Sequence, residues 1–76
     1  MDITPYVGQA FRHFREQAGM SQEQVALAAG LDRTYVSGIE RSRRNPSLRS
    51  MQRIAVVLGT DLAELFSKAR ELASVR

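Results

Sequence analysis

Arginine side chains are the chemically most distinctive groups in this chain, and they gather in its middle. The stretch 32–53 contains six arginines and only two carboxylates. These arginines are Arg33, Arg41, Arg43, Arg44, Arg49 and Arg53. The rest of the chain holds five basic and six acidic residues, so the formal net charge of +3 originates in this stretch. Such a concentration suits a polyanionic partner, although a solvated arginine-rich face would have the same composition.

The residue types needed for catalysis or metal binding are not assembled in the sequence. It has no cysteine and a single histidine, His13, which we interpret as a surface residue. We find no phosphate-binding glycine loop and no catalytic set of histidine, carboxylate and serine. We therefore expect no enzyme activity, no cofactor and no metal. With no apolar run near the roughly 20 residues of a membrane span and no signal-peptide pattern, we expect a cytoplasmic protein.

The hydrophobic pattern predicts an all-α fold. The 76 residues allow one small domain, 1–76, and apolar residues recur at helical spacing with no sustained alternation. Polar residues that cap helices then mark five starts. These are Thr4, Ser21, Asp32, Ser47 and Thr60. The pattern indicates a compact five-helix bundle, in which Gly8 is unfavourable for the first helix by about 1 kcal/mol relative to alanine.

Apolar stripes identify the faces that the helices are expected to bury. The expected residues are Val7, Ala10, Phe11, Phe14 and Ala18 in the first helix; Val25, Ala26 and Ala29 in the second; Val36 and Ile39 in the third; Leu48, Met51, Ile54, Ala55 and Leu58 in the fourth; and Leu62, Leu65, Phe66, Ala69 and Leu72 in the fifth. The fifth stripe is wider than one small core needs.

The second and third helices match the requirements of a helix-turn-helix over residues 22–41. Two short helices that cross steeply need a small residue at the crossing, here Ala26, and a turn residue that tolerates positive φ, here Gly30. Leu31 fills the corner, and Val36 and Ile39 face inward. A general helical hairpin would show part of this pattern, so a purely structural unit stays as the alternative.

The stretch 14–66 resembles the Xre/phage-repressor-like helix-turn-helix family. The matching segments are GMSQEQVALAAGLDRTYVSGIERSRRNPSL and IAVVLGTDLAELF. Within this family, LDRTYVSGIERSRRN is especially similar to the controller proteins of restriction–modification systems. The resemblance implies a lambda-repressor-like DNA-binding domain and a small dimeric regulator of its own gene and the endonuclease gene. One departure is Ser42, where many family members have glycine; serine is strained in a left-handed conformation.

The exposed face of the third helix is the part expected to enter the major groove. Arg33 lies near its start, and a planar guanidinium pairs with both acceptors of guanine. Thr34 offers a hydroxyl and a methyl group to phosphate or thymine. Tyr35 is either a phosphate contact or a core aromatic with a solvated tip, and Ser37 either allows close approach or is an ordinary exposed serine.

The resemblance implies further DNA contacts. Gln22 matches a residue that clamps the phosphate backbone, and Arg43, Arg44 and Asn45 form a loop beside the sugar-phosphate chain. We predict that Arg33, Thr34 and Arg44 read sequence, and that the others position the protein. The others are Gln22, Tyr35, Ser37, Arg43 and Asn45. The resemblance also implies that Arg15 and Glu40 pair across the first and third helices as part of the fold.

The fifth helix is predicted to form a homodimer. Its candidate interface residues are Leu62, Leu65, Phe66, Ala69 and Leu72, with Ala69 expected on the outer part of the stripe. A dimer would place two recognition helices on a pseudo-palindromic operator. RNA polymerase is a candidate partner for Glu23, although a solvated glutamate is the simpler interpretation. The alternatives to a controller protein are a general Xre-type repressor and a protein-interaction module of the same fold, such as an antitoxin or coactivator.

Overall fold

Side-chain oxygens cap four of the five helices in the computed structural model, which describes residues 1–75. The helices are α1 (Thr4–Gln17), α2 (Gln22–Ala29), α3 (Arg33–Glu40), α4 (Leu48–Val57) and α5 (Leu62–Ser74). Ser21, Asp32 and Ser47 cap α2, α3 and α4 as predicted. Each accepts a hydrogen bond from a backbone N–H two or three residues further on, which the helix itself leaves unpaired. The predicted all-α, five-helix architecture is confirmed.

The starts of α1 and α5 differ by one residue from the prediction. Asp61, not Thr60, caps α5, because its carboxylate accepts the N–H of Glu64 at 2.8 Å. Thr4 is already the first residue of α1 and is not its cap. The carboxylate of Asp2 accepts both the N–H and the hydroxyl of Thr4, at 3.0 and 2.6 Å. The side chains of Asp2 and Asp61, which precede the helices, therefore accept hydrogen bonds from N–H groups in the first turns of α1 and α5.

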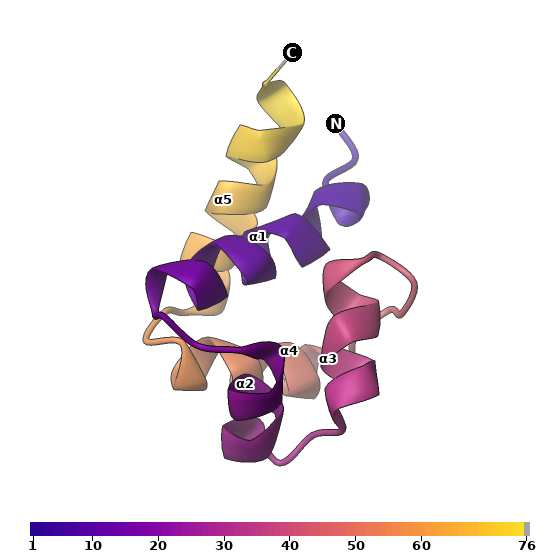
Figure 1. Ribbon diagram of the computed structural model, residues 1–76. Coiled ribbons are helices and arrows are strands. Elements are labelled where there is room, and N and C mark those ends of the chain that lie inside the picture. Colours follow the sequence, from indigo (N-terminus) through magenta and orange to yellow (C-terminus); the bar gives the residue numbers. More distant parts are fainter. Residues whose placement is uncertain (76) are drawn as a thin grey trace.

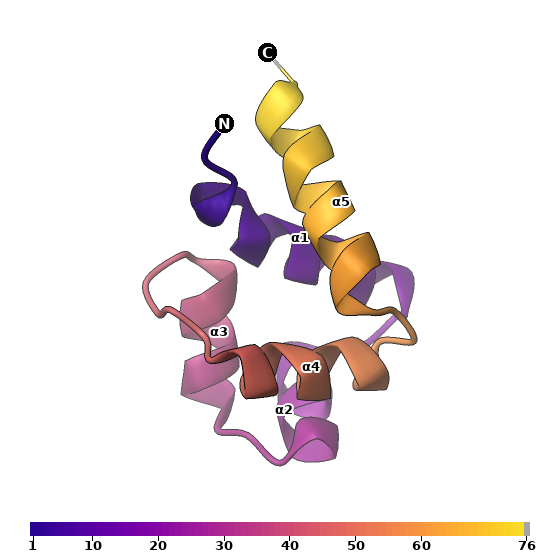
Figure 2. The same ribbon diagram turned by 180° about the vertical axis from the view of Figure 1, so that it is seen from behind.

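The core lies where α1 and α5 cover the three-helix group α2, α3 and α4 (Figure 1). The largest fully buried side chains come from all five helices. They are Phe11, Val25, Val36, Ile39, Ile54 and Leu65. Seen from behind, α5 crosses α1 in the upper part of the molecule, and α4 lies in front of α2 in the lower part (Figure 2). None of the five helices has the length and apolarity that crossing a membrane would require.

Two residues of the expected apolar stripes are exposed. Ala18 is exposed because it forms the C-cap of α1, where the chain turns into Gly19 at φ +68°. Leu48 is 64% exposed because it is the first residue of α4. Both predictions were wrong for the same reason. Helix periodicity assigns a residue to one face of its helix but does not show whether other helices cover that face at the end of the helix.

Candidate nucleic-acid interface

The α2–α3 unit has the geometry of a helix-turn-helix. Ala26 is buried at the crossing, and Gly30 ends α2 in the left-handed conformation at φ +69°. The N–H of Leu31 then donates to the carbonyl oxygen of Ala26 at 2.8 Å, which closes the turn. Val36 and Ile39 face inward and are each 2% exposed. This leaves the opposite side of α3 free at the molecular surface (Figure 1).

The first turn of α3 presents two predicted sequence-reading residues. Arg33 and Thr34 are both exposed. Asp32 accepts hydrogen bonds from the N–H of Thr34 at 2.8 Å and from its hydroxyl at 2.5 Å. These bonds, the hydroxyl first, lower the pKa of Asp32. The hydroxyl proton of Thr34 is therefore engaged by Asp32, although the residue as a whole is exposed.

Tyr35 is a core aromatic with a polar tip, and its predicted phosphate contact stays a prediction. Its ring packs against the core, and its hydroxyl oxygen accepts the N–H of Ser47 at 3.3 Å. The guanidinium carbon of Arg44 lies 5.7 Å from the ring centroid, within the range of a cation–π contact. Because a hydroxyl that accepts from one partner can still donate to another, the phenolic proton remains available to an external acceptor.

The loop after α3 is tied to that helix through Gly38. The N–H groups of Arg43 and Arg44 both donate to the carbonyl oxygen of Gly38, at 2.8 and 3.2 Å. A β-carbon at position 38 would collide with the Arg44 side chain, which would have to move to admit any larger residue. Ser42 adopts φ +59°, as the resemblance implied, and its hydroxyl donates to the carbonyl oxygen of Pro5 at 3.2 Å. The loop therefore has a defined path beside α3.

The buried carboxylate of Glu40 joins three helices. Arg15 donates to it twice, from Nε at 2.6 Å and from Nη2 at 3.0 Å, which confirms the expected pair. The hydrogen bond to Glu40 raises the pKa of Arg15. Gln22 also donates to Glu40, from Nε2 to Oε1 at 3.1 Å. Sequence reasoning missed this bond because it joins side chains 18 residues apart with no local pattern.

The six arginines of the middle stretch form no salt bridge with any residue of the range 1–75. All six are exposed. The salt bridges among residues 1–75 are Arg12–Glu16, Arg15–Glu40 and Lys68–Glu71, and none includes these arginines. Their charge is therefore available to a polyanion.

The predicted interface on α5 needs correction. Leu65 and Ala69 are 0% exposed, so they belong to the monomer core and cannot contact a second chain directly. They lie four residues apart, one turn above the other, on the face that α5 turns toward α1. Leu62, Phe66 and Leu72 are half-buried and remain candidates.

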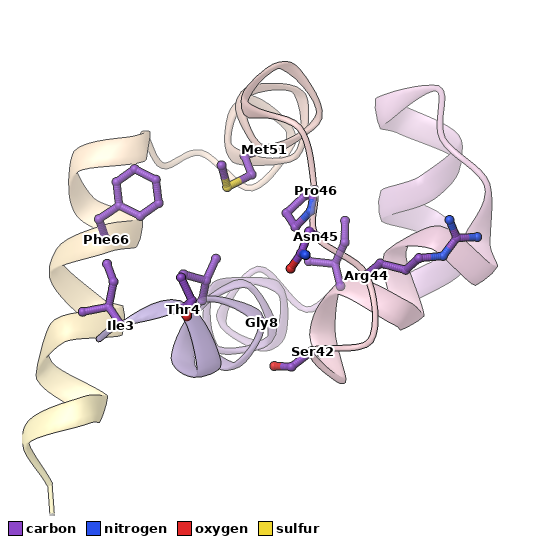
Figure 3. A pocket seen from close by; sticks show the side chains of 11 residues that line it. Ile3, Thr4, Gly8, Ser42, Arg44, Asn45, Pro46, Met51 and Phe66 are labelled. Atoms are coloured by element: carbon purple, nitrogen blue, oxygen red, sulfur yellow. The ribbon is translucent and has the colours of Figure 1, made fainter. Parts of the chain in front are cut away.

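Phe66 opens onto an apolar cavity of about 480 Å³. Ile3, Val7 and Met51 line it with Phe66, and the loop after α3 forms its opposite wall (Figure 3). The charged end of Arg44 points away from this cavity, so only the aliphatic part of that side chain contributes to the lining.

Comparison with known proteins agrees with this geometry. The helix-turn-helix family model matches residues 11–65. The control protein C.MunI from a Mycoplasma species is 43% identical over 67 residues, which span 87% of this chain and 90% of that protein. The crystal structure of the restriction–modification controller protein C.AhdI from Aeromonas hydrophila is 43% identical, with a TM-score of 0.80 over 83% of this chain and 96% of that one.

The fold and the family match thus define a transcriptional regulator of the helix-turn-helix class, not an enzyme. The chain belongs to the helix-turn-helix family whose model covers residues 11–65.

Proposed function

We propose that this protein is a restriction–modification controller that binds operator DNA in a sequence-specific manner. The observation that carries this proposal is the group of exposed arginines at the start of α3 and after its end, which form no salt bridge among residues 1–75: Arg33, Arg41, Arg43 and Arg44. The relatives support it: C.MunI, C.SmaI and C.BamHI are control proteins, and one structural match is a nucleoprotein complex of C.Esp1396I. A general repressor of this family is the alternative within the same class.

We propose two kinds of contact with the DNA. Arg33, Thr34 and Arg44 read bases, and the remaining predicted residues position the protein on phosphates. Those residues are Gln22, Tyr35, Ser37, Arg43 and Asn45. Structural matches include single variants of C.Esp1396I at successive arginine, threonine and tyrosine positions. This chain has the same three residues in succession from Arg33, which supports the start of α3 as the part that reads DNA.

A homodimer completes the proposal, because one recognition helix covers only a few base pairs. We place its interface at the cavity beside Phe66, together with the half-buried residues Leu62 and Leu72. An open apolar surface of this kind is typical of an interaction site. Two-fold symmetry would set the recognition helices about 34–36 Å apart, on successive major grooves of a pseudo-palindromic site. Glu23, exposed in the first turn of α2, is our candidate contact for RNA polymerase.

The direct test is selection of bound duplexes from a random DNA library by the purified protein. We expect a pseudo-palindromic consensus with half-sites about one helical turn apart. The selected sequence should also occur upstream of the protein's own gene, with methyltransferase and endonuclease genes adjacent. Recovery of no consensus would contradict the proposal and favour a protein-interaction module. A consensus without the neighbouring genes would favour a general repressor.

A further inference from the structure

The carboxylate of Glu40 accepts one more hydrogen bond than its ion pair requires. Its side chain is 4% exposed, and Arg15 already binds both oxygens. Arg15 is itself anchored through a third bond, from Nη1 to the carbonyl oxygen of Met20 at 2.8 Å. The guanidinium therefore compensates the buried charge without help from a neutral amide. Charge compensation therefore does not explain the hydrogen bond from Gln22 to Glu40.

That bond determines how the Gln22 carboxamide is oriented. An ionised carboxylate only accepts hydrogen bonds, so the amide must turn its NH2 group toward Glu40 and its oxygen away. The nitrogen carries two hydrogens, and one remains after the bond to Glu40 is made. Gln22 is only half-buried and is the first residue of α2, so the second N–H can reach a ligand at the surface.

We propose that Glu40 is a positioning residue for DNA binding, which holds the Gln22 amide ready to donate to a backbone phosphate. Arg15 is also needed in this arrangement, because its positive charge cancels the charge of Glu40, which would otherwise repel the phosphate. The inference rests on the proposed function. A glutamine held in this way binds more tightly than a free one, because less side-chain freedom is lost when the phosphate contact forms.

A matched pair of double variants separates this role from simple fold maintenance. Arg15→Met with Glu40→Gln removes the ion pair but keeps an acceptor for Gln22. Arg15→Met with Glu40→Met removes the pair and the acceptor together. Neither variant leaves a buried charge without its partner, which is the usual reason for severe destabilisation.

Affinity should be measured on the duplex selected by the wild-type protein, well below the melting temperature of each variant. We expect the variant with Glu40→Gln to bind within about twofold of wild type, and the one with Glu40→Met to bind about three- to tenfold more weakly, as for loss of one hydrogen bond. Adding Gln22→Ala to both double variants should abolish the difference in their DNA affinities. Ethylation of the phosphate that interferes with wild-type binding should no longer matter in Gln22→Ala or in the Glu40→Met variant.

The wild-type protein offers a second measurement, which remains valid if the methionine variant does not fold. Nuclear magnetic resonance relaxation of side-chain amides should show the Gln22 NH2 group as rigid in free protein and the exposed Gln52 group as mobile. Equal mobility of the two groups would overturn the inference, and so would equal affinities of the two folded double variants. Failure of the wild-type protein to select any DNA would instead overturn the proposed function.

Discussion

Gly8 in α1 lies directly against the main-chain carbonyl oxygen of Ile39 near the end of α3. A β-carbon at position 8 would overlap that oxygen and would lie 2.8 Å from the carbonyl oxygen of Glu40. The two helices can approach this closely only because position 8 has no side chain. The same approach brings α1 beside the helix end that carries Glu40, the partner of Arg15.

We therefore predict that Gly8→Ala destabilises the protein by about 2 kcal/mol. Overpacking against backbone atoms destabilises a protein by about 1–3 kcal/mol or more. The better helix propensity of alanine returns about 1 kcal/mol, which is less than half of the larger overpacking costs. Thermal denaturation followed by circular dichroism should show a melting temperature lower by roughly 10 °C. The neighbouring exposed residue gives the control: Gln9→Ala should leave the melting temperature nearly unchanged. A Gly8→Ala protein as stable as wild type would contradict the close packing.

Ser42 combines an unfavourable backbone conformation with a favourable hydrogen bond. Left-handed φ angles are unfavourable by about 1 kcal/mol or more for a residue with a β-carbon, whereas the exposed bond to Pro5 contributes about 0.5 kcal/mol. Ser42→Gly should thus be more stable than Ser42→Ala by about 1 kcal/mol, with wild type between them. Urea denaturation of the three proteins measures the order. If the alanine variant is the most stable, strain at this position is absent.

Asp32 should make stability depend on acid pH. Hydrogen bonds from Thr34 lower the pKa of its carboxyl from the ordinary value of 3.8. The stabilising effect is therefore complete above that value and is lost as pH falls through the lower pKa of the folded state. Urea denaturation at pH 6, 4 and 3 should show wild type approaching Asp32→Asn in stability as pH falls. Thr34→Val, which removes the hydroxyl donor, should weaken this dependence; an unchanged dependence would contradict the assignment.

Arg33 and Arg43 should affect DNA binding in different ways. Arg33→Ala should weaken binding to the selected site by about 1–3 kcal/mol and relax the base preference at the position it reads. Arg43→Ala should weaken binding to all sequences alike and reduce the salt slope by about one. Titrations of selected and random duplexes at several salt concentrations measure both effects. Equal losses on both duplexes for Arg33→Ala would show that it does not read sequence.

The proposed dimer can be tested at the cavity beside Phe66. A carboxylate buried in an apolar interface has no partner, so Phe66→Glu or Ile3→Glu should weaken dimerisation at least tenfold. Sedimentation measures the assembly, and circular dichroism confirms that each variant is folded. Leu27→Glu is the control, because Leu27 is 84% exposed and is not part of the cavity lining. A wild-type protein that is monomeric at micromolar concentration would contradict the dimer. Ala69→Asp is unsuitable, since it would place a charge in the monomer core.

Local features of this fold could be predicted from sequence, because short-range hydrogen bonds determine them. Ser21, Asp32 and Ser47 cap helices through residues two or three positions away, and Gly30 has the positive φ that the turn requires. The exposed start of α3 followed from the inward positions of its apolar residues. All of these depend on spacing alone, which the sequence contains.

Features that depend on a distant partner were missed or misassigned. The apolar stripe of α5 is wide enough to be compatible with two orientations of the helix. Only the packing of α5 against α1 shows that Ala69 lies in the core. Gly8 is unfavourable by helix propensity, yet the approach of α3 requires it. Gln22 is predicted to contact DNA, but its bond to Glu40 was not expected, because that bond joins α2 to α3. Single-residue propensities contain no information about contacts between residues that are distant in the sequence.

The start of α1 and the end of α5 lie at the same end of the molecule, and α2 lies at the other (Figures 1 and 2). Any peptide fused before Thr4 or after Ser74 would thus leave the protein on the side remote from α2. A fluorescent tag or a surface tether after Ser74 should therefore leave α2 accessible, whereas a peptide before Thr4 would emerge beside the loop after α3, because Ser42 donates to the carbonyl oxygen of Pro5.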